Sequence, residues 1–186
     1  MVNNVQFESA IAKIFKEVII DLKFEVRYVR FDEIQLHNDK CILRFIFDTG
    51  RILCDFINPE AKRTSESNLR EDGMPNGFPV YPVHSVWKFL YPHDSKNFSY
   101  EGWDIDGQVM AIKRLLLERF TNVLNGDFSW TNYFKANDSK LSEKIEYMMS
   151  HWEMDNPIRI KFQEGNINWE REFDVYKSHL DSLQGQ

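Results

Sequence analysis

Hydrophobic and polar residues alternate between Phe24 and Ile57 in the manner of β-strands. Two runs, residues 40–47 and 52–57, are rich in β-branched and aromatic side chains and flank a short turn that contains Gly50. A Gly-containing turn between such runs is typical of a β-hairpin. With Thr49-Gly50 as the loop, the predicted opposite pairs are Phe47 with Ile52, Phe45 with Cys54, and Leu43 with Phe56.

The two faces of this hairpin differ, because side chains alternate sides along a strand. One face is apolar and is predicted to form the core. The other carries Arg44 directly opposite Asp55, which predicts a cross-strand ion pair. Upstream, Asn38-Asp39 is predicted to be a two-residue turn that places Leu36 opposite Cys41 and extends the apolar face. Residues 24–31 predict a further strand, whose register the pattern leaves open.

Apolar residues recur at helical spacing both before and after this strand-forming region. Asp106 is the predicted N-cap of one helix, and Asn125-Gly126 its end. Residues 158–162 alternate like a strand, yet the preceding Asn156-Pro157 is also a good helix start, so both alternatives stay open. The other predicted helices cover residues 7–22, 82–91, 138–155 and 169–180.

These elements predict a single α+β domain over residues 1–186. Its N-terminal helix packs on an antiparallel β-meander of three to four strands, and a mostly helical C-terminal half follows. The sheet-forming part covers about residues 24–57, a polar loop about residues 60–77, and the helical part about residues 80–182.

Composition narrows the classes of function. The formal net charge of −6 argues against a nucleic-acid ligand and is compatible with a basic protein partner. No apolar run approaches the roughly 20 residues that span a bilayer, and the first residues lack the features of a secretory signal. Cys41 and Cys54 lie on adjacent strands but not opposite each other, so we expect free, buried thiols in a reducing cytoplasm.

Two sets of polar residues could carry chemistry. Asp48 or Asp55, followed by Glu60-Ala61-Lys62, resembles the Asp…Glu-x-Lys pattern of restriction-type nucleases, in which carboxylates hold Mg²⁺. Pro59 ends the strand on which the Glu-x-Lys pair would have to sit, so we predict that these residues are not catalytic. The second set would serve another hydrolase or a metal site and comprises His84, His93 and Asp94.

The leading hypothesis is therefore a non-catalytic cytoplasmic binding protein that needs no cofactor. Its predicted architecture resembles that of small bacterial immunity and antitoxin-type proteins, which neutralise a toxin by covering it; the resemblance is one of fold alone. A basic protein partner is expected to meet the acidic side of the 138–155 helix. A metal-dependent nuclease or other hydrolase is the alternative. The predicted partner-binding residues are Glu143, Glu146, Glu153 and Asp155.

Overall fold

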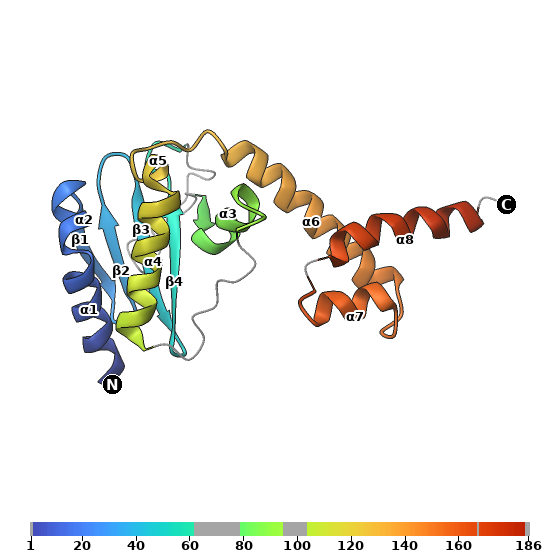
Figure 1. Ribbon diagram of the computed structural model, residues 1–186, viewed down its shortest axis with the longest axis horizontal. Coiled ribbons are helices and arrows are strands. Elements are labelled where there is room, and N and C mark those ends of the chain that lie inside the picture. The colour runs from blue at the N-terminus through green and yellow to red at the C-terminus, as the bar shows by residue number, and fades with distance from the viewer. Residues whose placement is uncertain (1, 62–78, 95–103, 167, 185–186) are drawn as a thin grey trace. The chain divides into compact units, whose positions relative to one another are not determined.

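The computed structural model describes residues 2–61, 79–94, 104–166 and 168–184 (Figure 1). The sequence predicts one domain, and the contacts of the structure fall into two compact units. We call residues 1–129 the sheet unit and residues 130–186 the helical unit, and each is described by itself. The predicted polar loop lies mostly outside the described residues, because residues 62–78 are not among them.

The sheet unit is built on a five-stranded antiparallel meander in which each strand pairs with the next along the chain. The predicted α+β class, with an N-terminal helix on a meander, is confirmed. A short fifth strand, at the start of the segment predicted to be helical, is added to the predicted three to four. The strands are β1 (Glu25–Arg30), β2 (Glu33–His37), β3 (Ile42–Asp48), β4 (Arg51–Ile57) and β5 (Val80–Pro82).

The β3–β4 hairpin has the predicted register, with Phe45 opposite Cys54 and Arg44 opposite Asp55. Its loop residues Thr49 and Gly50 both have positive φ, 46° and 88°. Two such residues give a tight hairpin loop whose twist matches that of the flanking strands. Because the loop is so short, it allows the two strands little choice of register. This explains why the sequence pattern predicted the register correctly.

The predicted register of the β2–β3 turn is wrong by two residues. Leu36 lies opposite Leu43 rather than Cys41, and the loop spans residues 38–41. The Asn38 side-chain oxygen accepts hydrogen bonds from the backbone N–H groups of Lys40 (2.9 Å) and Cys41 (2.7 Å), which stabilises the longer loop. A shift of two residues keeps every side chain on its face, so the predicted core face is correct.

Helices cover the apolar face of the sheet, and Figure 1 shows α1 and α4 lying over it. Phe15 meets the ring of Phe45 edge-on at 5.1 Å, and Phe120 meets Phe56 at 5.2 Å. The predicted first helix is divided at Phe15 into two. The helices of this unit are α1 (Val2–Ile14), α2 (Lys16–Asp21), α3 (Val83–Leu90), α4 (Ile105–Arg119) and α5 (Thr121–Leu124).

Asp106 is not the cap of α4, contrary to the prediction. The preceding Asp104 is the N-cap, and its carboxylate accepts a hydrogen bond of 2.7 Å from the Gly107 N–H. Asp106 lies in the first turn and forms an exposed ion pair with Lys13 of α1. The two aspartates are two residues apart, and only the geometry of the turn distinguishes them.

The helical unit contains α6 (Thr131–His151), α7 (Pro157–Gln163) and α8 (Trp169–Gln184). The segment that the sequence left open between strand and helix is α7, which begins at Pro157. The Asn156 side chain caps it by accepting from the N–H groups of Ile158 (2.9 Å) and Arg159 (3.4 Å). The α6 helix begins seven residues before the predicted Asp138, with Phe134 hydrogen bonded back to Trp130.

The core of the helical unit is small and largely aromatic. Trp152 contacts the rings of Phe173 (4.8 Å) and Tyr176 (5.2 Å), and half-buried aromatic residues surround this cluster. Such contacts stabilise a helix cluster beyond the apolar area that they bury. The buried members of the cluster are Met148, Trp152, Ile158 and Phe173.

Candidate functional site

The predicted partner-binding carboxylates lie on α6 and on the turn that joins it to α7. Glu143 and Glu146 are three residues apart on α6, and their side chains are exposed. The placement of Glu153 and Asp155 on the same helix is wrong, because α6 ends at His151 and Trp152 has an extended backbone (ψ 140°). Both residues are exposed in the turn. We call these four residues the 143–155 carboxylates.

Three lysines of this unit, Lys144, Lys161 and Lys177, form ion pairs with carboxylates of α8. Lys144 lies 2.8 Å from Asp174 and 3.4 Å from Glu170. Lys161 of α7 pairs with Glu172, and within α8 Lys177 lies 3.6 Å from Asp181. Across the described residues, the 143–155 carboxylates take part in no ion pair. Their negative charge is therefore not neutralised within the part of the chain that the structure describes.

Lys144 is paired with two carboxylates of α8, and these pairs affect its pKa. Burial lowers the pKa of its ammonium group, but the hydrogen bond to Asp174 and the charge of Glu170 outweigh that effect and raise the pKa above its ordinary value. Lys144 is therefore charged, and it pairs with Asp174 and Glu170 of α8. It does not pair with Glu143, its neighbour in sequence, among the described residues.

Arg159 of α7 supports the C-terminal end of α6, and the sequence pattern gave no sign of this role. Its side chain is buried, and Nη1 donates to the carbonyl oxygen of Trp152 at 2.7 Å and more weakly to that of Met149 at 3.5 Å. A cation at the carbonyl end of a helix is favourable. The positive charge of Arg159 offsets the mildly unfavourable interaction between the helix dipole and the carboxylates near that end. Its hydrogen bonds also hold the turn that carries Glu153 and Asp155.

In the nuclease-like pattern, Asp55 is bound by an arginine and Glu60 lies beyond the end of the strand. Arg44 donates to the Asp55 carboxylate from Nε (2.9 Å) and Nη2 (2.6 Å). Burial raises the pKa of Asp55, and the Arg44 hydrogen bond and charge only partly oppose this rise. β4 ends at Ile57, and Glu60 lies in a turn where its N–H donates to the Asn58 side chain (2.9 Å). Lys62 lies outside the described residues.

Asp48, the remaining carboxylate of the nuclease-like pattern, is exposed at the end of β3, opposite Arg51 of β4.

The second predicted set, His84, His93 and Asp94, lies on and after α3. Burial and the nearby Lys88 lower the pKa of His84, while Asp94 forms an ion pair of 2.8 Å with Arg119. His93 is exposed beside Asp94. Among the residues that the structure describes, no group of three or more His, Cys, Asp or Glu side chains is placed to hold a metal ion.

The cysteines are free and buried, as predicted. Burial raises the pKa of Cys41 to about 12, and burial together with the charge of Asp55 raises that of Cys54. Both thiols therefore stay protonated near neutral pH and lack the thiolate that a nucleophile needs.

A polar network on the outer face of the sheet was not predicted. Glu33 is 0% exposed, and its carboxylate accepts hydrogen bonds from Arg30 Nη2 (3.0 Å) and Gln35 Nε2 (2.7 Å). The Gln35 oxygen lies 2.5 Å from His37 Nε2, so neutral His37 donates this hydrogen bond. Each member hydrogen bonds the next, which makes the network a structural element of the sheet.

Comparison of the chain with protein-family models, with curated proteins and with solved structures finds no match. The residues that the structure describes include no helix with the length and apolar character needed to cross a membrane. The 143–155 carboxylates are among the exposed carboxylates that the ion pairs of the described residues leave available.

Proposed function

We propose that this protein is a non-catalytic, cytoplasmic binding protein that uses the 143–155 carboxylates to bind a basic protein partner. The observation that carries the proposal is that these carboxylates are exposed and form no ion pair with any residue that the structure describes, whereas Lys144, Lys161 and Lys177 bind the carboxylates of α8. The two free, buried thiols accord with a reducing compartment.

Physical chemistry favours a role in association over a role in folding. Exposed carboxylates add little to stability, and those near the C-terminal end of a helix oppose its dipole. The same carboxylates attract a positively charged surface across the solvent and increase the rate at which it docks. A partner with clustered Lys or Arg side chains would supply the cations that the 143–155 carboxylates lack.

The specific form of this proposal is a bacterial immunity- or antitoxin-type protein that neutralises a basic toxin by covering it. Its support is the acidic balance of the chain, with a formal net charge of −6, together with the likeness of the general α+β architecture, predicted from the sequence, to that of such proteins. Inhibition by covering requires exposed complementary surface and no catalytic group on the inhibitor.

The experiment is an affinity capture from lysate of the source organism with the wild-type protein and with two charge-reversed variants. In the first, Glu143, Glu146 and Glu153 are changed to Lys. In the matched control, the exposed Asp21, Asp39 and Glu60 of the sheet unit are changed to Lys, which alters the net charge equally.

A basic protein that is captured by the wild type and the control but lost from the first variant supports the proposal. Equal capture of every protein by all three forms contradicts it. Equal loss from both variants also contradicts it, because that result assigns the binding to net charge rather than to the 143–155 carboxylates.

A further inference from the structure

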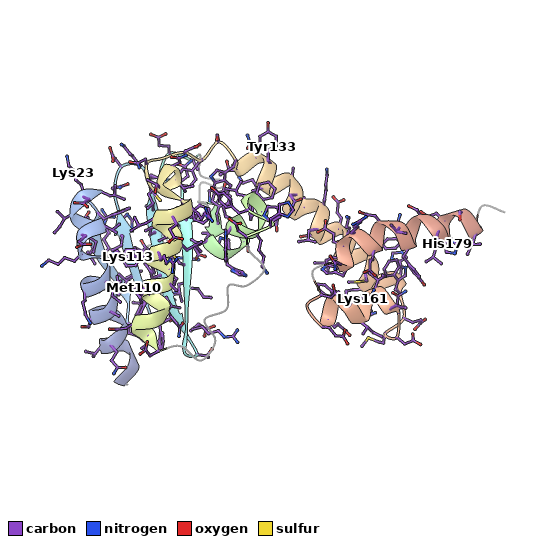
Figure 2. The ribbon with its side chains drawn as sticks, in the orientation of Figure 1. Lys23, Met110, Lys113, Tyr133, Lys161 and His179 are labelled. Carbon is purple, nitrogen blue, oxygen red and sulfur yellow. The ribbon has the colours of Figure 1, made fainter. Side chains whose placement is uncertain are left out.

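A groove of about 600 Å³ runs along α8 of the helical unit and reaches the first turn of α7. Figure 2 shows Lys161 on α7 and His179 on α8. Pockets of this volume are in the range that ligands and peptide side chains occupy. The lining residues used below are Ile158, Arg171, Glu172, Val175, Tyr176 and His179.

Three of the lining residues form one stripe on α8. Arg171, Val175 and His179 are spaced by four residues, so they follow each other along the same side of the helix. At a rise of 1.5 Å per residue, the first and last are separated by about 12 Å, or roughly two turns. Val175 stands between them and is 68% exposed, although it is apolar. Ile158 of α7 is buried beneath the groove.

Two formally charged side chains line the groove, Arg171 and Glu172, and they differ in whether they are paired among the described residues. Glu172 is the one carboxylate among the lining residues, and Lys161 pairs with it. Arg171 and His179 are exposed and, within the described part of the chain, take part in no ion pair. A guanidinium group that is free to bind a carboxylate therefore lies at one end of an apolar stripe, and an imidazole lies at the other.

We propose that this groove binds an amphipathic helix of a protein partner, with carboxylates two turns apart on either side of apolar residues. The choice of occupant rests on charge complementarity, because the unpaired guanidinium of Arg171 lies beside the exposed apolar Val175 among the described residues. A helix laid along α8 repeats with the same period as Arg171, Val175 and His179 and can therefore meet all three. The apolar side of such a helix would cover Val175 and Ile158, and its carboxylates would meet the two polar ends. This surface uses other residues and the opposite charge from the 143–155 carboxylates, so it goes beyond the proposed function and can fail separately.

The probe is a synthetic helical peptide of about 14 residues, roughly four turns, with Glu at two positions two turns apart and Leu on the same side between them. The matched peptide has Lys in place of both Glu residues. We expect the full-length protein to bind the Glu peptide, measured by fluorescence anisotropy. Arg171→Glu should weaken this binding about tenfold and should reverse the preference in favour of the Lys peptide.

Val175→Asp should weaken binding by a similar factor, because it places a charge in the apolar stripe. The controls are Leu183→Asp, which alters another exposed apolar residue of α8, and Lys140→Glu, which removes an exposed cation of α6. Both should bind the Glu peptide like the wild type. Circular dichroism of each variant should match that of the wild type, since all the altered side chains are exposed.

The proposal is overturned if the Glu peptide does not bind, or if Arg171→Glu and Val175→Asp bind it as the wild type does. It is also overturned if dodecanoate binds with the same dependence on Arg171 while the peptide does not, because the occupant is then a small amphiphile. Dimerisation of the protein that Val175→Asp abolishes, without peptide binding, would assign the groove to a second copy of the chain.

Discussion

Buried carboxylates of the sheet unit and exposed carboxylates of the helical unit lie in opposite electrostatic environments. In the sheet unit, the buried carboxylates Glu33 and Asp55 are each bound by an arginine from the sheet. In the helical unit, the 143–155 carboxylates are exposed and unpaired among the described residues, and the groove on α8 holds a cation that is equally unpaired. Charges that are satisfied inside the fold serve the fold, whereas the 143–155 carboxylates and Arg171 are available for binding, as are the exposed Asp21, Asp39 and Glu60 of the sheet unit.

The cores of the two units differ as well. In the sheet unit, phenylalanine rings from helices meet those of the strands, and Phe7, Phe15, Phe45, Phe56 and Phe120 are almost completely buried. The helical unit relies on a small cluster centred on Trp152 and Phe173. A larger core stabilises more per residue, so the sheet unit is expected to be the stable scaffold.

The largest expected effect concerns the core of the sheet unit. Phe45→Ala should lower the free energy of unfolding by about 3–5 kcal/mol, because a buried aromatic ring is replaced by a cavity. Urea unfolding followed by circular dichroism measures it. Leu53→Ala, which alters a 44% exposed residue on the neighbouring strand, should cost much less. If the urea midpoint of unfolding of Phe45→Ala equalled that of the wild type, the core face would be wrongly assigned.

The next effect concerns the buried ion pair. Asp55→Asn should cost about 3 kcal/mol, because it leaves the largely buried Arg44 without its counter-ion. Glu25→Gln, which breaks the exposed pair with Arg27, should leave the free energy of unfolding nearly unchanged, because solvent screens that pair. Similar costs for the two substitutions would remove the distinction between satisfied buried charge and exposed charge.

A smaller effect should appear as a dependence on pH. Burial, with a lesser contribution from the charge of Arg27, lowers the pKa of His37 from an ordinary value of 6.5 to about 4. The unfolded chain therefore binds the proton first as pH falls, so stability that is present above pH 6.5 is lost between pH 6.5 and 4. Because the imidazole is only about half-buried, we expect a loss on the order of 1 kcal/mol.

The control for this effect is the difference between the wild type and His37→Gln, since carboxylates also titrate in part of this range. That difference in unfolding free energy should shrink as pH is lowered from 7 to 4. A difference that stays constant over this range would show that His37 does not titrate with folding. His93→Gln, which alters an exposed imidazole, should not reproduce the trend.

The sequence predicted the parts of the fold that short-range chemistry determines. The Thr49-Gly50 loop admits essentially one hairpin, so the β3–β4 register and the Arg44–Asp55 pair were predictable. The Asn38 loop was not, because a side chain that caps two backbone N–H groups lengthened it. The error was two residues and left the faces unchanged.

The candidate site was predictable only in part. Exposure of Glu143 and Glu146 follows from helical periodicity, but the end of α6 at His151 depends on Arg159, which reaches it from another helix. Residues 158–162 suit strand and helix alike, and the Asn156 cap decides between them. The groove on α8 exists only once α7 packs against that helix, and no local pattern records such packing.

The most direct test of the proposed function is the rate at which a captured basic partner associates with the wild type and with the Glu143, Glu146 and Glu153→Lys variant. Melting temperatures should be nearly equal, because these side chains are exposed. At low salt the variant should associate at least about tenfold more slowly, and the difference should shrink as salt screens the charges. The Asp21, Asp39 and Glu60→Lys control should associate nearly as fast as the wild type. Unaltered association of the first variant at low salt would place the interface elsewhere.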